Sequence, residues 1–271
     1  MLFLLLTLLG AGALRGQVAP SAPPPSYLYE PAYAIDNVLR GEARPYVPQP
    51  GDILLATDSN FFWKITHDLA LAFEPHNSAV VVALPDGGLG VLEAGPDDCL
   101  FVRINPLLPH LKHYSEKGPV WIRKRKTPLT PEQSAALTAF ALRQNGKWFA
   151  LPRLGGQLTI FRSRGPLRTF FLGKPRGDRS GYFCSELVTE SLVASGLIDP
   201  ATARPAATYP HDLFFEKSLN FYLRHHFSLV CGWEPPARWV CQPVGGACTD
   251  APPATLGVPR PYLPARLGTP Y

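Results

Sequence analysis

Charged residues are scarce in this chain of 271 residues, at 17% of the sequence, whereas about a quarter is usual for globular proteins. With 46% apolar residues beside so little charge, the composition excludes a highly charged disordered protein. The Lys and Arg residues are scattered apart from one short run, Arg123 to Lys126. This spread argues against a nucleic-acid-binding surface, whereas the net charge of +5 suits anionic surroundings such as cell-wall polymer or lipid head groups.

Long apolar runs are also missing. The first residues, LFLLLTLLGAGAL, form an apolar stretch of about a dozen residues, which is too short to cross a bilayer. The stretch ends in Ala11-Gly12-Ala13, a small-x-small pattern typical of a signal-peptide cleavage site. We therefore expect 1–19 to be a signal peptide or N-terminal anchor, and the protein to be exported to the periplasm, cell envelope or exterior. Any membrane association would use this N-terminus.

Several functional motifs are absent from the sequence. There is no G-x-S-x-G motif, which argues against a serine hydrolase of that type. There is no C-x-x-C pair either, so a zinc site remains a weakly supported alternative. Its ligands would come from His225, His226, Cys231, Cys241 and Cys248. We expect neither a metal nor any other cofactor.

Proline is abundant, with 31 residues, and it gathers near both ends of the chain. The segments 20–26 and 251–271 read as extended linker or tail. We divide the chain into the N-terminal segment, a Pro-rich linker at 20–47, a domain at 48–228, and a Cys-containing extension with a Pro-rich tail at 229–271.

Apolar periodicity and turn residues predict the elements of the domain. Strands are expected at 48–58, 78–84, 89–95 and 120–126, and helices at 59–73, 130–146 and 184–196. The turn Pro85–Gly88 predicts a hairpin between two of the strands. An antiparallel hairpin mixed with helices favours an α+β fold over alternating βαβ units.

Cys184 is the candidate nucleophile. It begins the predicted helix 184–196, where the helix dipole and the unpaired backbone N–H groups favour a thiolate. The same N–H groups, that of Ser185 among them, are placed to hold an oxyanion. The alternative is a small buried residue at a helix start, since free Cys is among the most buried residue types.

A thiolate nucleophile needs an imidazole partner, and His76 is the best placed of the seven histidines. It follows Pro75 and directly precedes the strand 78–84. By contrast, His67 falls inside a predicted helix, while His110 and His113 fall in an apparent polar loop.

A third group would orient the imidazole, and Glu93 on the next strand is the candidate. If the hairpin turns through Pro85–Gly88, Glu93 lies opposite Val80. Val80 and His76 share one face of the strand, so Glu93 lies on that face too, at a distance of roughly 13 Å from His76 along the strand. Asp97 is the fallback for this role.

Five strings of this sequence together resemble the permuted papain-like amidases of the YaeF/YiiX type, which are relatives of the NlpC cell-wall peptidases. They are PGDILL at 50–55, His76 before its strand, VLEAG at 91–95, VWIRKRK at 120–126 and YFCSELV at 182–188. The order His, acid, Cys is specific to this permuted group. The sequence departs from the family pattern after His76, where Asn77 and Ser78 replace small apolar residues.

The resemblance implies a circularly permuted papain-like (NlpC-like) fold, with an antiparallel sheet packed against helices. By position, Cys184 matches the nucleophile, His76 the base and Glu93 the orienting carboxylate. Tyr182 matches an aromatic position whose hydroxyl would assist the oxyanion. If Cys184 is the free thiol, four cysteines are left as disulfide candidates, with the pairing open: Cys99, Cys231, Cys241 and Cys248.

The expected function is that of a cysteine amidase or peptidase acting on an amide, such as one in a cell-wall peptide. The first alternative is a thiol-dependent lipid acyltransferase or esterase. The second is a non-catalytic module on the same scaffold that binds wall polymer or a ligand, in which Cys184 would be an ordinary thiol. No nucleic-acid partner is expected.

Overall fold

The computed structural model describes most of the chain between residues 26 and 241. The described residues are 26–32, 35–36, 38–57, 64–65, 68–69, 72–95, 100–157, 159, 169, 171, 173–216 and 229–241.

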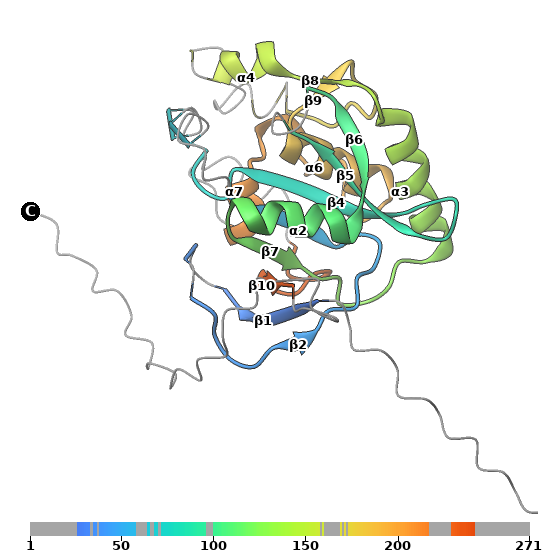
Figure 1. Cartoon of the computed structure of the whole chain (residues 1–271). Coiled ribbons are helices and arrows are strands. Elements are labelled where there is room, and N and C mark those ends of the chain that lie inside the picture. Colours follow the sequence, from blue (N-terminus) through green and yellow to red (C-terminus); the bar gives the residue numbers. More distant parts are fainter. Residues whose placement is uncertain are drawn as a thin grey trace, which may run out of the picture.

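Helices and strands alternate irregularly along this part of the chain (Figure 1). The strands are β1 (Tyr27–Pro31), β2 (Arg44–Pro45), β3 (Ile53–Ala56), β4 (Asn77–Ala83), β5 (Leu89–Ala94), β6 (Val102–Pro106), β7 (Val120–Arg123), β8 (Trp148–Phe149), β9 (Gly181–Tyr182) and β10 (Ala237–Val240). The helices are α2 (Leu107–Lys117), α3 (Pro131–Gln144), α4 (Leu151–Gln157), α6 (Cys184–Ala194), α7 (Pro210–Phe215) and the short 3₁₀ helix η1 (Pro205–Ala207).

An eight-stranded sheet in the order β2-β1-β10-β7-β3-β4-β5-β6 forms the centre of the structure. Each of its strand pairs is antiparallel. Helices α3 and α6 pack on one face of β4, and α2 packs on the sheet beside β5, β6 and β7. The α+β architecture expected from the sequence, with an antiparallel sheet packed against helices, is confirmed.

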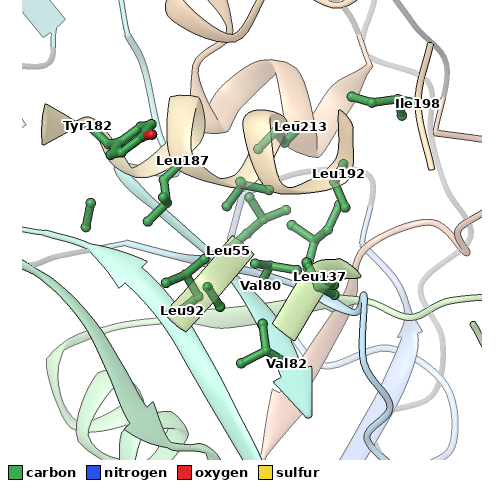
Figure 2. Close-up of a cluster of buried hydrophobic side chains, with 14 of the residues drawn as sticks. Leu55, Val80, Val82, Leu92, Leu137, Tyr182, Leu187, Leu192, Ile198 and Leu213 are labelled. Carbon is green, nitrogen blue, oxygen red and sulfur yellow. The ribbon is translucent and has the colours of Figure 1, made fainter. Parts of the chain in front are cut away.

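The two faces of the sheet bury two separate apolar clusters. On the α6 face, Val80 and Leu92 meet Leu187 and Leu192 of α6 and Leu137 of α3 (Figure 2). On the α2 face, the cluster holds the alternate strand residues and three side chains of α2. Those strand residues include Ala79, Val81 and Val91. Because neighbouring strand residues point to opposite faces, this division shows which side each residue of β4 and β5 faces.

The predicted local signals form the expected elements. Strands β3, β5 and β7 fall within the predicted strand segments, β4 begins and ends one residue before its predicted segment, and α3 and α6 begin within one residue of their predicted starts. The Thr130 hydroxyl accepts from the Gln133 amide at 3.2 Å, and the Gln133 side chain accepts from the Thr130 amide at 3.1 Å. This reciprocal capping box is what the sequence at the start of α3 predicts.

The sheet extends beyond the predicted domain bounds of 48–228. Strands β1 and β2 come from the segment assigned to a linker, and β10 comes from the segment assigned to an extension. Strand β10 lies between β1 and β7, so the two segments widen the same sheet as the central strands. Most of the predicted helix 59–73 lies outside the described residues, as do the N-terminal segment and the C-terminal tail.

Helix α2 corrects the prediction of a polar loop around His110 and His113. Leu107, Leu111 and Tyr114 recur at helical spacing and are buried, and Pro109 lies in the first turn, where proline is tolerated. In the part of the chain that the structure describes, no helix combines the length and apolarity needed to cross a membrane.

Candidate active site

Cys184 is the first residue of α6, at the end of a short strand-to-helix connection. Strand β9 pairs in parallel with β8, with Gly181 opposite Trp148. A Cβ at Gly181 would lie 2.6 Å from the Trp148 carbonyl oxygen, so this close approach of two backbones requires glycine. The extended Phe183 then precedes the helix. The predicted position of Cys184 at the helix start is confirmed.

The Cys184 thiol is packed against the beginning of β4. Its sulfur lies 3.8 Å from the carbonyl oxygen of His76, a residue 108 positions away in the sequence. The side chain is 8% exposed. Burial raises the pKa of the thiol, while hydrogen bonds from the Ser78 amide and hydroxyl lower it, and burial has the larger effect. Burial therefore opposes the thiolate that the helix dipole alone would favour.

His76 directly precedes β4 and is buried. Its amide donates to the Ala56 carbonyl at 3.0 Å, which continues the pairing of β4 with β3 by one residue. The preceding Glu74–Pro75 peptide bond is cis, and the carbonyl oxygen of Glu74 lies 2.8 Å from Nδ1 of His211. The structure thus brings the backbone of His76 to the Cys184 sulfur, and the pairing of the His76 imidazole with the thiol stays a prediction.

The predicted register of Glu93 is wrong by one residue. Leu92, and not Glu93, lies opposite Val80, and Glu93 lies opposite Ala79. The reason is that the hairpin closes between Leu84 and Gly88: the Leu84 amide donates to the Gly88 carbonyl at 2.9 Å, which leaves three turn residues instead of the four expected. A one-residue change of register moves a side chain to the other face of a sheet. Glu93 therefore lies on the α2 face, with Ala79 and Val91.

The contacts of Glu93 reflect this position. Its Oε2 lies 2.6 Å from Nε2 of His110, and its Oε1 accepts from the Asn77 amide group and the Tyr114 hydroxyl. Glu93 and His110 are each 6% exposed. Asp97, the fallback for the orienting role, lies outside the described residues.

Tyr182 and Ser185 are the two residues predicted to assist the oxyanion. Their side chains form hydrogen bonds with other parts of the protein. The buried Tyr182 hydroxyl lies 2.9 Å from Oε1 of Gln144 and accepts from the Arg179 amide at 2.9 Å. Burial raises the pKa of Tyr182 to about 12. The buried Ser185 hydroxyl donates to the Thr208 carbonyl at 2.7 Å. An oxyanion role for either residue stays a prediction. For Ser185, the group predicted to bind the oxyanion is the backbone N–H.

Two buried glutamates of α6 were missed by the sequence analysis. Glu186 receives both terminal nitrogens of Arg153 at 2.8 Å, and it also accepts from the Phe183 amide at 3.3 Å. Glu190 accepts from the amides of Arg176 and Gly177. The spacing of two glutamates four residues apart, as the only charged residues of α6, is the signal that points to buried, paired carboxylates. These pairs fix the chain immediately before the thiol.

The cysteines depart in part from the predicted disulfide set. Cys231 is a free, exposed thiol, which corrects its place among the disulfide candidates. Cys241 is disulfide-bonded, and Cys99 and Cys248 lie outside the described residues.

The basic run is partly structural. Arg123 is buried and donates to the Leu213 carbonyl at 2.9 Å, and it pairs with Glu216. Arg125 is buried with its guanidinium 4.3 Å from the ring of Trp233. Alternate residues of the run therefore face the interior, because β7 is a central strand of the sheet.

Solved structures of other proteins are similar to this chain, among them a metalloprotein. The metalloprotein yiiX from Escherichia coli O157:H7 is similar in structure with a TM-score of 0.38 and 22% sequence identity, over 55% of this chain and 67% of that one. No family model matches the chain, and no curated protein matches it. Among the described residues of this chain, no group of three His, Cys, Asp or Glu side chains is arranged to hold a metal ion.

Proposed function

We propose that this protein is a thiol-dependent hydrolase that cleaves amides through a thioester on Cys184, with His76 as the general base and then the general acid. The observation that carries the proposal is the packing of the Cys184 thiol, at the first residue of α6, against the His76 end of β4. This contact brings the backbone of His76 to a thiol at a helix start. Nucleophilic acyl transfer needs a cysteine, a histidine base within reach and N–H donors for the oxyanion.

The chemistry follows in two halves. His76 removes the thiol proton, and the sulfur attacks the substrate carbonyl carbon to form the C–S bond. Backbone N–H groups at the start of α6 stabilise the oxyanion. The tetrahedral intermediate then breaks its C–N bond, and the leaving amine takes the proton from His76. In the second half, His76 deprotonates a water molecule that hydrolyses the thioester and restores the thiol.

The raised pKa of the buried thiol fits a general-base mechanism better than a pre-formed thiolate. A thiol that is neutral at rest needs a base to act at neutral pH. Amides, such as those of cell-wall peptides, are the substrate class that we propose, and esters are the alternative that the same thiol would cleave.

The test is alkylation by iodoacetamide at about pH 7, below the free-Cys pKa of about 8.5, with each cysteine-containing peptide quantified by mass spectrometry. Cys231 is free and exposed in the same molecule, so it serves as the internal reference for reagent and protein concentration. We expect His76→Ala to slow the modification of Cys184 at least about tenfold and to leave that of Cys231 unchanged. Equal Cys184 rates in the two proteins would refute the proposed pair and favour a non-catalytic module.

A further inference from the structure

Strands β4 and β5 separate beside the Cys184 thiol. The register between them ends at the pair Ala79–Glu93, whereas the register of β4 with β3 continues to the pair Asn77–Ala56. Residues 77 and 78 thus lie beyond the last β4–β5 pair. The sulfur of Cys184 contacts this end of β4, through the His76 carbonyl and the Ser78 amide. The position of this short segment therefore decides what faces the thiol.

The Asn77 side chain ties this end of β4 to the opposite face of the sheet. Its amide nitrogen donates to Oε1 of Glu93 and is paired with the Tyr114 hydroxyl. Its carbonyl oxygen accepts from the Ser78 amide at 2.8 Å. One side chain thus connects a carboxylate on the α2 face to the backbone group that also approaches the thiol.

Glu93 is held in turn by α2. Oε2 of Glu93 faces Nε2 of His110 at 2.6 Å, and Nδ1 of His110 lies 3.4 Å from the Asn105 side-chain nitrogen. If Asn105 donates to Nδ1, the proton of a neutral imidazole is on Nε2, the nitrogen nearest to Glu93. Each carboxylate oxygen thus has a polar neighbour, which is what a buried carboxylate requires. We call Glu93, His110, Tyr114 and Asn77 the Glu93 cluster.

We propose that Glu93 is a positioning residue that acts through Asn77: from the α2 face, the Glu93 cluster holds the start of β4 so that His76 and Ser78 meet the Cys184 thiol. This inference rests on the proposed function. It replaces a direct contact of Glu93 with the His76 imidazole by an indirect one through a neighbouring side chain and its backbone.

The first test removes two members of the cluster in turn. Glu93→Ala and Asn77→Ala are each expected to slow the modification of Cys184, relative to Cys231, by between about tenfold and 100-fold, since small misplacements of reacting groups cost rate on this scale. Because both act on one segment, the double variant should be no slower than the slower single variant. Additive losses would overturn the coupling through Asn77.

Glu93→Gln separates positioning from a direct electrostatic role. The Gln oxygen can accept from Asn77 and Tyr114, and its NH₂ group can donate to His110 in the other tautomer. We expect this variant to restore the rate of Cys184 modification to within about threefold of wild type. If the charge itself orients His76, the amide should fail as Ala does, because changing a triad carboxylate to an amide costs about 10⁴ in rate.

Leu111→Ala is the matched control for lost stability. Leu111 is fully buried on α2, the helix that carries His110 and Tyr114, but belongs to the apolar cluster. Under conditions where every variant is folded, this variant should modify Cys184 at the wild-type rate. A slow Leu111→Ala or a fast Glu93→Ala would overturn the proposal. Should Glu93→Ala fail to fold, Asn77→Ala decides alone. Failure of the proposed function is distinct, because the wild-type rate would then not depend on His76.

Discussion

The two faces of the sheet at β4 differ in where they keep their polar groups. On the α6 face, strand side chains such as Val80 and Val82 are apolar, and the proposed nucleophile lies at the helix start, where it contacts backbone at the beginning of β4. On the α2 face, a carboxylate, an imidazole and a phenol are buried between the apolar side chains of the strands and α2. Alternate residues of one strand therefore serve different tasks, and nearness in sequence to a reactive group does not imply contact with it.

The two faces also differ in the groups that stabilise a buried carboxylate. Glu186, in α6, is neutralised by the guanidinium groups of Arg153 and Arg179. Glu93 is held by His110, Tyr114 and Asn77. An ion pair fixes a helix start rigidly, whereas a hydrogen-bonded network can transmit the position of one strand to another.

Replacing the thiol should have the largest effect, and only on the α6 face. With p-nitrophenyl acetate as the probe and Cys231→Ser as the background, Cys184→Ala is expected to lose between about 10⁴ and 10⁶ in the rate of nitrophenol release, as expected for a missing nucleophile. The free energy of unfolding should change by less than about 1.5 kcal/mol. An unchanged rate would show that this thiol takes no part in the reaction.

Apolar truncations should affect the two faces equally. Leu192 on the α6 face and Leu111 on the α2 face are both fully buried. We expect Leu192→Ala and Leu111→Ala each to lower the free energy of unfolding by about 2–5 kcal/mol, measured by urea denaturation. A much smaller loss on one face would show that its cluster is loosely packed and would weaken the symmetry of the comparison.

Asp52, another buried carboxylate directly before β3, extends the comparison to the dependence of stability on pH. It accepts from the Tyr46 hydroxyl and the Arg125 amide, yet burial raises its pKa from 3.8 to about 6. Since the native state binds the proton more tightly, the stability from this group is fully present below about pH 4. This stability is lost as the pH rises through about 6, and the free energy of unfolding falls in total by about 3 kcal/mol.

The measurement is the free energy of unfolding of wild type and Asp52→Asn between about pH 4 and pH 7. Wild type should gain stability relative to the variant as the pH falls. Parallel pH profiles for the two proteins would contradict the raised pKa.

Removing one hydroxyl should give the smallest effect. Tyr114→Phe deletes the hydrogen bond to Glu93 and keeps the ring, so we expect a loss of about 1 kcal/mol in the free energy of unfolding. Tyr46→Phe is the control, because its hydroxyl binds Asp52 and not the Glu93 cluster. Only Tyr114→Phe should slow the alkylation of Cys184. If Tyr114→Phe and Tyr46→Phe alkylate Cys184 at equal rates, the positioning role belongs to Glu93 and Asn77 without the Tyr114 hydroxyl.

The sequence by itself determined the local elements. The capping box of α3, the turn that joins β4 to β5 and the helix start at Cys184 all arise from residues within a few positions of one another. Such signals depend on backbone preferences and on short hydrogen bonds, which are the same in any fold. Helix α2 was also readable from the spacing of Leu107, Leu111 and Tyr114, although its polar residues and Pro109 concealed it.

Only the tertiary structure decided the face of Glu93 and the partners of the thiol. Whether Leu84 lies opposite Leu89 or opposite Gly88 changes the register by one residue, and this choice moves the side chain of Glu93 to the other face. The contact of Cys184 with β4 joins residues 108 positions apart, and the imidazole beside Glu93 comes from a separate helix. Such contacts depend on how whole layers pack on a sheet, so no local pattern specifies them.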